Sequence, residues 1–334
     1  MTPPRRSRIG VAGVGALGYH HARILGGLDG VALSGIHDVR PERAGDVARD
    51  LGTTAWASLE ALLDASDALV VAVPTCAHED VALAALGREM PVLVEKPLAP
   101  TLAAADRILA AAERGGTFVQ TGHVERFNAA VLAALPFLQR PLFIESHRLA
   151  PFSPRSTDVA VVLDLMIHDV DLVMGLVGAP VVELAATGIP VLTSSVDIAN
   201  ARLTFAGGAV ANLTASRVSR QRVRKLRVFQ PSGYLSLDLA EGTGEYLRLR
   251  CDLADLQARA AAGPGAADLS EVVEQLLLRG DGVEPLRREL EDFRNAVRGH
   301  SKPAVTGDDG RAALAVALAI QERIAAHVAD TRPA

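Results

Sequence analysis

The chain has 334 residues, of which 49% are hydrophobic and 22% are charged, and its formal net charge is -5. This length predicts two domains, and the composition is that of a folded globular protein. The negative charge argues against nucleic-acid binding that depends on neutralising many phosphates. A local basic patch at residues 217–225 is the exception to this charge balance, and alternating arginines on a strand more often form a solvated face.

Cysteine content and hydropathy restrict the cellular setting. Cys76 and Cys251 are too few and too far apart to suggest a disulfide framework or a zinc site, and they favour a reducing cytoplasm. No uncharged apolar run approaches the roughly 18 residues that a membrane-spanning helix needs. We therefore expect a soluble cytoplasmic protein that binds neither membranes nor nucleic acid.

A glycine pattern follows the first apolar run of the chain. Residues 8–14 have the character of a strand, and apolar residues recur at helical spacing from Ala22 to Leu28. In the intervening turn the first glycine permits a tight bend, the second lets the backbone approach a pyrophosphate, and the third lets helix and strand pack closely. A tight turn alone could also demand glycine. The expected cofactor contacts are Gly13, Gly15, Ala16, Leu17 and Gly18.

The second predicted strand, from Val31 to Asp38, ends in a carboxylate twenty positions beyond Gly18. This is the spacing of the acid that accepts hydrogen bonds from the adenosine ribose. Because a carboxylate there repels a 2′-phosphate, the pattern favours NAD over NADP. Arg40 is a second candidate at this position, since its guanidinium could instead turn towards a phosphate.

Alternating strands and helices continue to residue 122. The patterns predict helices at 41–51, 59–64, 81–87 and 101–114, and strands at 53–56, 68–73, 92–95 and 118–122. Continuous apolar strands of this kind indicate a parallel sheet that helices cover on both faces, with ligands bound beyond the carboxyl ends of the strands. The polar residues that fall at those ends are cofactor candidates Pro74, Thr75, His78, Glu95, Lys96 and Gln120, and substrate candidate His123.

Lys96 is informative because the chain has only three lysines, the others being Lys225 and Lys302. A solvated cation in this arginine-rich sequence would more often be arginine. We interpret Lys96 as an ammonium at the nicotinamide end of the cleft, the alternative being a surface lysine after a strand.

Residues 156–178 are apolar on nearly every side and predict a buried helix that ends at Gly178. Asp164, His168 and Asp171 stand at i, i+4 and i+7, which places them on one face. Burying them is costly unless they are paired or functional. Asp164 is suited to orient His168, and His168 to acid–base work near neutrality. A metal site and a structural polar network remain alternatives, and Asp169 points away from this face.

Three motifs together resemble the Gfo/Idh/MocA family of sugar and inositol dehydrogenases: GVGALG at 13–18, EKP at 95–97 and DLMIHDVD at 164–171. The segment that starts at Lys302 is also similar to the closing segment of that family. The resemblance implies an α/β fold: a Rossmann-type doubly wound parallel sheet at 1–123, then an α/β domain at 124–334 with an open, mainly antiparallel sheet that makes homodimer or homotetramer contacts. It also implies that Lys96 holds the reacting hydroxyl, that His168 is the acid–base and that Asp164 is its partner.

Further segments look like one subgroup of that family, in which the 3-hydroxyl of UDP-N-acetylglucosamine is oxidised before an aminotransferase acts, towards lipid A. These segments lie at 122–131, 143–173 and 285–293. The helix departs from the family pattern, with Met166 and residues 159–163 replacing glycines, and this leaves the sugar open. A nucleotide sugar would need cations for its diphosphate. The substrate candidates beyond Lys96, His123, Asp164 and His168 are Arg126, Asn128, Arg148, Arg155, Arg217 and Arg220.

The remaining sequence predicts antiparallel strands and closing helices. Hairpins are expected at 197–216, with a turn at Gly207-Gly208, and at 224–239, whereas 251–282 is ambiguous. Helices are expected at 285–298 and 310–330, and the last of these could pack back on the first domain. Two other functions stay open, a free-sugar or inositol dehydrogenase and a non-catalytic NAD-binding regulator.

Overall fold

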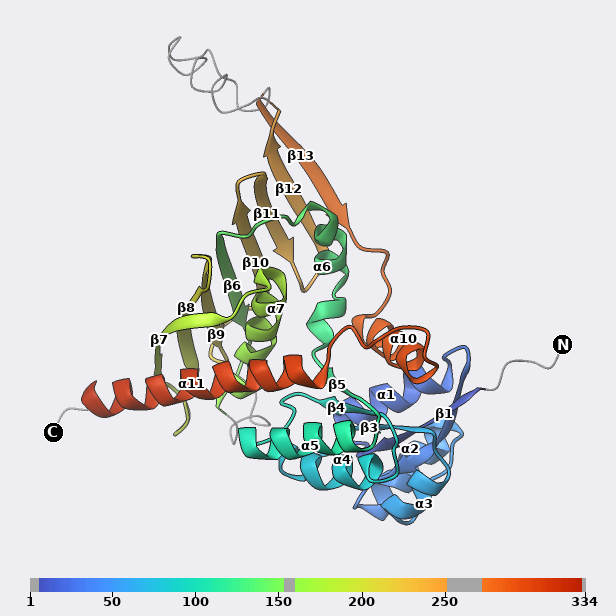
Figure 1. Cartoon of the computed structure of the whole chain (residues 1–334). Coiled ribbons are helices and arrows are strands. Elements are labelled where there is room, and N and C mark those ends of the chain that lie inside the picture. The colour runs from blue at the N-terminus through green and yellow to red at the C-terminus, as the bar shows by residue number, and fades with distance from the viewer. Residues whose placement is uncertain (1–5, 153–159, 251–271, 332–334) are drawn as a thin grey trace, which may run out of the picture. The chain divides into compact units, whose positions relative to one another are not determined.

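The computed structural model describes residues 6–152, 160–250 and 272–331 (Figure 1). Its contacts divide the chain into two compact units. The first unit comprises Met1–Val124 and Glu284–Ala315, and the second comprises Glu125–Val283 and Val316–Ala334. The first boundary lies beside the predicted one at residue 123. However, residues 284–315, which the sequence-based division places in the second domain, group with the first unit.

The first unit contains a five-stranded parallel sheet. Its strands are β1 (Ser7–Ala12), β2 (Val31–His37), β3 (Ala68–Val71), β4 (Val92–Glu95) and β5 (Val119–Gly122). They are arranged in the order β2-β1-β3-β4-β5, and every residue of β3, β4 and β5 is buried. The doubly wound parallel sheet that the apolar strands predict is therefore confirmed. The strand order reverses between β1 and β3, and sheets of this kind generally bind ligands beyond the carboxyl ends of the strands at that point.

Helices cover both faces of this sheet. They are α1 (Ala16–Gly26), α2 (Pro41–Leu51), α3 (Leu59–Asp64), α4 (His78–Leu86), α5 (Leu102–Arg114) and α10 (Pro285–Val297). Helices α1 and α10 lie on one face and α4 and α5 on the other (Figure 1). Leu290 and Phe293 of α10 join the apolar core formed by Ile9 and Leu25, which explains why this late segment belongs to the first unit. The predicted strand at 53–56 is reduced to one bridge between Ile36 and Ala55.

The second unit is built on an eight-stranded sheet. Its strands are β6 (Phe143–Leu149), β7 (Val181–Ile189), β8 (Ile198–Phe205), β9 (Val210–Ser216), β10 (Val223–Gln230), β11 (Gly233–Asp238), β12 (Thr243–Leu249) and β13 (Val273–Arg279). The order is β13-β12-β11-β10-β6-β9-β8-β7, and all pairs are antiparallel except β6 with β9. Both predicted hairpins, β8–β9 and β10–β11, are confirmed. The ambiguous segment contributes β13, and its first part, residues 251–271, lies outside the described residues.

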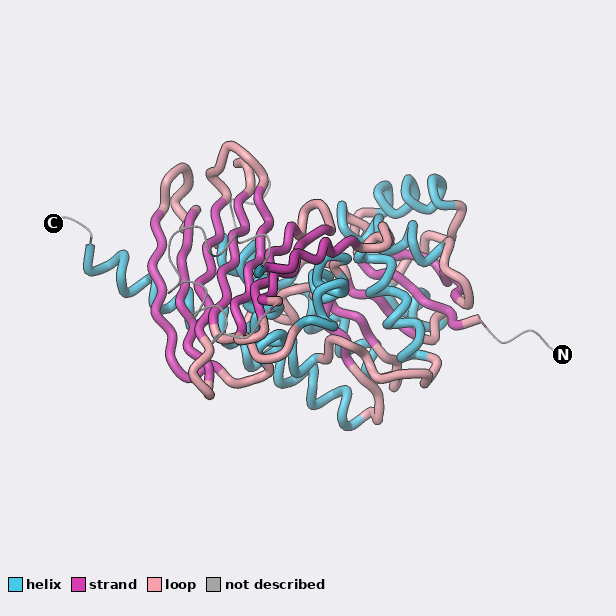
Figure 2. Tube along the Cα trace, turned by 90° about the horizontal axis from the view of Figure 1, so that it is seen from above, coloured by secondary structure: helices cyan, strands magenta, loops and turns pink. Residues whose placement is uncertain are grey.

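The helical segments of the second unit pack on one face of this sheet. Helix α6 (Ala129–Ala134) contacts β11, β12 and β13, and helix α7 (Ile167–Val177) contacts β6 and β9. Short 3-10 turns occur at Val124–Phe127 and Leu135–Phe137. Figure 2 shows the strands of this sheet as a continuous magenta array. Helix α11 (Gly307–Thr331) starts in the first unit, and its residues from Val316 onward belong to the second. Within the described ranges no helix is both long enough and apolar enough to cross a membrane.

Candidate functional site

The three glycines between β1 and α1 have distinct surroundings. Gly13 has a φ of +83°, and a Cβ there would lie 2.7 Å from the backbone of Ala72. A Cβ on Gly18 would lie 1.9 Å from the carbonyl oxygen of Gly13, so this glycine lets α1 approach the turn. By contrast, a Cβ on Gly15 would meet nothing within 4 Å. Contacts within the fold therefore require the first and third glycines, whereas Gly15 borders open space where a pyrophosphate could approach the backbone.

The N-terminus of α1 is suited to an anion. Gly15 is the N-cap and forms no side-chain capping hydrogen bond, and the first turn has no acidic residue. Ala16 and Leu17 are exposed, and Leu17 retains 43% of its accessible surface. The amides of this turn and the positive end of the helix dipole can therefore receive the phosphates of a dinucleotide.

Asp38 lies immediately after β2 and faces the glycine turn. Its Oδ2 accepts a hydrogen bond from the backbone N–H of Val14 at 3.0 Å, and its Oδ1 accepts from the backbone N–H of Arg40 at 3.0 Å. Burial opposes ionisation, but the hydrogen bonds from Arg40 and Val14 and the charge of Arg40 outweigh it and lower the pKa of Asp38. The carboxylate is thus ionised at neutral pH and lies beside the turn, where a ribose hydroxyl would be bound. The Arg40 side chain is exposed and its Nε lies 3.2 Å from Asp38 Oδ1.

The loop after β3 contributes exposed Pro74, half-buried Thr75 and buried His78. The ring nitrogens of His78 lie 3.0 Å from the carbonyl oxygen of Val73 and 2.9 Å from that of Pro97. Burial lowers the pKa of His78, which favours the neutral ring. His78 therefore connects the loops that follow β3 and β4. Its contacts hold these two loops together, and it does not face a ligand.

Lys96 follows β4 at the same edge of the sheet and is half-buried. The preceding Glu95 is 7% exposed, and its Oε1 lies 2.6 Å from Nε2 of His21. Its Oε2 accepts a hydrogen bond from the backbone N–H of Lys96 at 3.2 Å. Both oxygens of Glu95 are thus used inside the first unit, which does not support the prediction that Glu95 contacts the cofactor.

Gln120 in β5 and His123 directly after it are more deeply buried than the sequence suggests. Gln120 is fully buried and donates from Nε2 to the carbonyl oxygen of Glu289 at 3.3 Å. His123 is also fully buried, and its backbone N–H donates to the carbonyl oxygen of Thr121 at 2.8 Å. Gln120 therefore links β5 to α10, and neither side chain is open to a ligand in the structure.

The predicted acid–base residues lie at the start of the buried helix of the second unit. Asp164 is in a π-helical turn, Val162–Met166, and His168 is in the first turn of α7; both are half-buried. Such π turns are rare and often occur at functional sites. The predicted helix is confirmed from residue 161, and residues 153–159 lie outside the described ranges, with Arg155 among them.

Asp171 has a structural partner, although its spacing places it with His168. The guanidinium of Arg126 forms two hydrogen bonds to it, Nε to Oδ2 at 2.7 Å and Nη2 to Oδ1 at 2.8 Å. Gly175, one turn further along α7, makes room, because a Cβ there would lie 2.2 Å from Nη1 of Arg126. Arg126 thus connects the turn at residues 124–127 to α7. These contacts do not support its predicted role in binding substrate.

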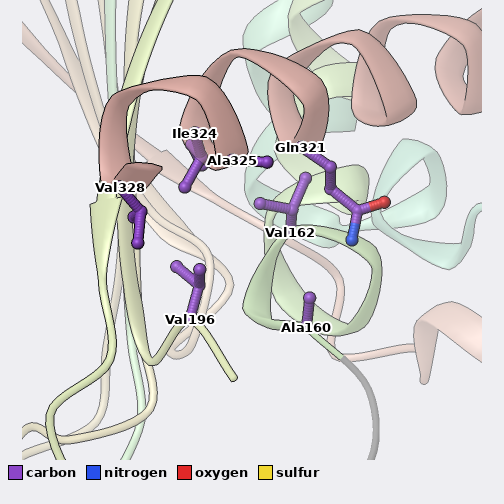
Figure 3. Close-up of a pocket in the computed structure, with 7 residues that line it drawn as sticks. All are labelled: Ala160, Val162, Val196, Gln321, Ile324, Ala325 and Val328. Atoms are coloured by element: carbon purple, nitrogen blue, oxygen red, sulfur yellow. The ribbon is translucent and has the colours of Figure 1, made fainter. Parts of the chain in front are cut away.

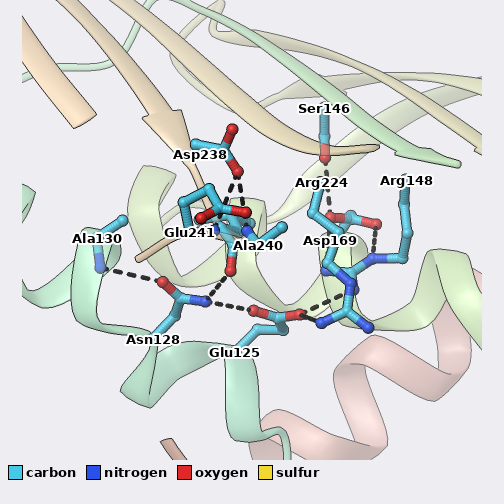
Figure 4. A network of polar contacts seen from close by, with 11 residues as sticks. Glu125, Asn128, Ala130, Ser146, Arg148, Asp169, Arg224, Asp238, Ala240 and Glu241 are labelled. Atoms are coloured by element: carbon cyan, nitrogen blue, oxygen red, sulfur yellow. Dashed lines mark hydrogen bonds and ion pairs between the residues drawn. The ribbon is translucent and has the colours of Figure 1, made fainter. Parts of the chain in front are cut away.

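Arg148 likewise pairs with residues of its own unit. Its Nε lies 2.7 Å from Asp169 Oδ2 and its Nη1 lies 2.8 Å from Glu125 Oε1 (Figure 4). Asn128 caps α6, accepting from the N–H of Ala130 and donating to Glu125. Burial disfavours the charged guanidinium, but the two carboxylates outweigh it and raise the pKa of Arg148. With its side chain 4% exposed, Arg148 is not placed to bind a diphosphate, and Asn128 is equally committed.

The remaining cationic candidates differ in exposure. Arg217 is 4% exposed, and its Nε lies 3.7 Å from Oδ1 of Asp197. Arg220 is exposed and borders a hollow of about 580 Å³ with Leu149 and Val223. Of the predicted diphosphate ligands in the described part of the chain, Arg220 is therefore the one that solvent reaches most freely.

A second hollow of the same unit, of about 300 Å³, lies between α11, the π turn and Val196 just before β8 (Figure 3). Its lining is almost entirely apolar, with Gln321 the one residue that carries a polar side chain; the others are Ala160, Val162, Val196, Ile324, Ala325 and Val328. Such a lining does not suit a charged nucleotide.

One group of side chains in the described residues has the composition of a metal site. His21, Glu95 and Glu289 are buried and present ligand-type atoms within 4.8 Å of one another. Two ligand atoms on one zinc ion lie about 3.3 Å apart when each bond is about 2.0–2.1 Å. The 2.6 Å between His21 Nε2 and Glu95 Oε1 is shorter, and it is the distance of a direct hydrogen bond. As arranged, this pair is a hydrogen-bonded contact rather than a metal site.

His21 is a residue whose role in this contact the sequence analysis does not predict. The spacing in the sequence does indicate that His21 is buried, since Gly18, His21 and Leu25 stand at i, i+3 and i+7 on the buried face of α1. No feature of the sequence, however, identifies the residue that a histidine on an apolar face will contact. Its contact with Glu95, 74 positions away, comes from packing α1 against the parallel sheet.

The glycine turn, the Asp38 carboxylate and Lys96 follow strands at one edge of a doubly wound parallel sheet, an arrangement typical of an NAD-dependent dehydrogenase. Residues 7–123 match the oxidoreductase family with an NAD-binding Rossmann fold, and residues 140–236 match the GFO/IDH/MocA C-terminal domain. The chain belongs to the Gfo/Idh/MocA family, whose members include dehydrogenases that act on sugar hydroxyls.

Two relatives span nearly the whole chain. A UDP-N-acetylglucosamine 3-dehydrogenase of Acidithiobacillus ferrooxidans is 35% identical over 96% of this chain and 97% of its own length. The solved structure of that enzyme superposes with a TM-score of 0.86, over 96% of this chain and 98% of the other. A myo-inositol 2-dehydrogenase of Thermotoga maritima is 26% identical over 95% of this chain and 96% of its own.

Proposed function

We propose that this protein oxidises the 3-hydroxyl of UDP-N-acetylglucosamine to a ketone with NAD as the acceptor. The observation that carries the proposal is the similarity to a UDP-N-acetylglucosamine 3-dehydrogenase at 35% identity over 96% of the chain. Lys96 follows the carboxyl end of β4, two strands from β1 and on the same edge of the sheet as the glycine turn, and supplies a cation at the edge where a nicotinamide ring would lie.

In this proposal, Lys96 and His168 act on the same hydroxyl group. NAD, when bound, would supply the acceptor for the hydride that leaves the carbinol carbon. His168 takes the hydroxyl proton, Asp164 orients the imidazole, and the Lys96 ammonium donates a hydrogen bond to the oxygen as negative charge develops on it. The alcohol thus loses one hydride and one proton and becomes a ketone. Because the described second unit offers Arg220 as an exposed cation, we assign it to the sugar diphosphate.

The product is a sugar ketone, and an aminotransferase is the class of enzyme that converts such a ketone to an amine. We therefore place the reaction before an amination step, on a route to lipid A with amide-linked chains. We place the protein in the cytoplasm, where an exposed free thiol such as Cys76 stays reduced. We also propose a homodimer or homotetramer that assembles through the large sheet of the second unit.

The reaction is tested with the purified chain, NAD and UDP-N-acetylglucosamine deuterated at C3. Oxidation at this carbon transfers deuterium to the cofactor, which mass spectrometry detects, and it slows the appearance of NADH. Substrate deuterated at C4 is the control and should transfer no label. Label transfer from C4 alone would contradict the proposed position of attack.

A free-sugar or inositol dehydrogenase is the second candidate, because the Thermotoga maritima relative also spans the chain. Parallel assays with myo-inositol and free N-acetylglucosamine separate the two. NADH formation with myo-inositol and none with the nucleotide sugar would establish the second candidate. Absence of turnover with every sugar, together with NAD binding, would instead support a non-catalytic regulator.

A further inference from the structure

His21 and Glu95 form a buried contact next to Lys96, the residue whose ammonium takes part in the proposed reaction. His21 is fully buried in α1, and its Nε2 lies 2.6 Å from Oε1 of Glu95. The other oxygen of Glu95 accepts the backbone N–H of Lys96 at 3.2 Å. One carboxylate therefore connects the helix that follows the glycine turn with the backbone of Lys96.

The direction of the hydrogen bond follows from the surroundings of the imidazole. Nδ1 of His21 is buried and has no hydrogen-bond partner among the described residues. A proton on Nδ1 would therefore be left unsatisfied, at a cost of about 1–3 kcal/mol. The ring thus carries its proton on Nε2 and donates to Glu95. Burial by itself disfavours the carboxylate, but the hydrogen bond from His21, the charge of Lys96 and the hydrogen bond from the Lys96 N–H outweigh it and lower the pKa of Glu95.

The packing around Glu95 leaves it little freedom. A Cβ on Gly122 of β5 would lie 3.0 Å from the Glu95 carboxyl carbon, so the neighbouring strand is in close contact with this side chain. On the other side of Lys96, the carbonyl of Pro97 is 2.9 Å from the His78 ring. Lys96 is thus held at the backbone on both sides. The other titratable neighbours of Glu95 are Glu289 on α10 and His78 on α4.

We propose that His21 is a positioning residue for the reaction: through Glu95 it fixes the backbone of Lys96 and keeps a negative charge beside the Lys96 ammonium. The inference rests on the proposed function in assigning a reaction role to Lys96. The electrostatic interaction is mutual, so the Glu95 charge favours the ammonium form of Lys96. Loss of the His21 donor removes one of the two hydrogen bonds that hold the Glu95 carboxylate, and Lys96 then loses part of its backbone restraint.

The small number of lysines allows a test that needs no substrate. Reductive methylation with ¹³C labels Lys96, Lys225 and Lys302 without removing their charge, and variants of the last two assign the signals. We expect the titration midpoint of the Lys96 signal to fall by about 1 pH unit in Glu95→Gln, which removes the charge at every pH. In His21→Leu we expect the Lys96 signal to change its chemical shift and to broaden, because the restraint on the Lys96 backbone is weakened. His21→Gln keeps an N–H donor near Nε2 and should restore most of the difference. His20→Leu, which changes an exposed histidine on the same helix, should leave the signal unchanged.

Kinetics supply a second readout. We expect His21→Leu to lower kcat by about tenfold or more while the KM for NAD stays within about twofold, and His21→Gln to recover most of kcat. Thermal melting of each variant identifies any that fails to fold. A Lys96 signal that keeps its chemical shift and line width in folded His21→Leu overturns the inference, whatever the activity. Full turnover in a Lys96→Met variant would instead overturn the proposed function of Lys96. The NMR result does not depend on turnover, so the two failures can be told apart.

Discussion

Arg148 Nε lies 2.7 Å from Asp169 Oδ2, and the same guanidinium reaches Glu125 through Nη1 at 2.8 Å. A buried ion pair is costly to break by removing one partner, because the other charge stays buried. We expect Arg148→Met to lower the free energy of unfolding by about 3–5 kcal/mol, measured by urea denaturation. Arg227→Met is the matched control, since that side chain is 49% exposed and should change stability by less than about 0.5 kcal/mol. A raised KM for the sugar with unchanged stability would show that Arg148 binds substrate after all.

Gly15 and Gly18 should respond differently to the same methyl group. In Gly18→Ala the new Cβ would lie 1.9 Å from the Gly13 carbonyl oxygen, so we expect a loss of about 1–3 kcal/mol or more of stability. In Gly15→Ala the Cβ meets nothing within 4 Å, and the melting temperature should be unchanged. Because that space is where the pyrophosphate approaches, NAD should bind about tenfold more weakly, a change of about 1.4 kcal/mol. Calorimetric titration with NAD checks this. Unaltered affinity in Gly15→Ala would place the phosphates elsewhere.

Asp38 should determine the choice between NAD and NADP. Its lowered pKa keeps it charged at neutral pH, and a carboxylate repels the 2′-phosphate of NADP. We expect Asp38→Asn to weaken NAD binding about tenfold and to raise the NADP-to-NAD ratio of kcat/KM by a similar factor. Asp46→Asn on α2, an exposed acid, should alter neither. A ratio that stays constant in Asp38→Asn would leave cofactor choice to Arg40 or another residue.

Removal of the Lys96 ammonium should affect the chemical step more than cofactor binding. We expect Lys96→Met to lower kcat by about 10²-fold or more, because a hydrogen-bond donor to the developing alkoxide is lost. The NAD dissociation constant should stay within about twofold, as measured by protein fluorescence or calorimetry. Lys302→Met, an exposed lysine of the same unit, should retain full activity. Equal activity in the two variants would contradict a catalytic role for Lys96.

Asp197 should give the second unit an acid-sensitive contribution to stability. Burial disfavours its charge, but hydrogen bonds from the N–H groups of Thr193, Val191 and Leu192 and from the Thr193 hydroxyl outweigh it, lowering the pKa of Asp197 from 3.8 to about 2. A lowered pKa stabilises the fold above pH 3.8, and this contribution is lost as the pH falls towards 2.

We therefore expect Asp197→Asn to be less stable than the natural chain by about 2–3 kcal/mol at neutral pH. This difference should stay constant down to about pH 4 and narrow below it. Denaturation curves at a series of pH values measure it, and Glu183→Gln on the exposed part of β7 is the control. A difference between the two chains that does not change with pH would show that the Asp197 charge contributes nothing.

Much of the first unit follows from local patterns. The glycine turn, the acid at residue 38 and the lysine after β4 are recognisable because each depends on residues adjacent in the chain or on the ends of apolar strands. Short-range periodicity also predicts both hairpins of the second unit correctly. The predicted strand at 53–56 is the exception: it forms one bridge, between Ile36 of β2 and Ala55.

Partners that lie far apart in the chain had to come from the tertiary structure. Asp169 and Asp171 are two positions apart, yet one pairs with Arg148 on β6 and the other with Arg126. The sequence by itself determined the class of fold and the residues at the sheet edge, since strand periodicity and turn chemistry are local. Only the tertiary structure decided that β6 lies between β9 and β10, that residues 284–315 belong with the first unit, and that His21 meets Glu95. The physical reason is that an unpaired charge is costly to bury, so a buried charged side chain must be paired. Which residue pairs with it depends on how distant segments of the chain pack together.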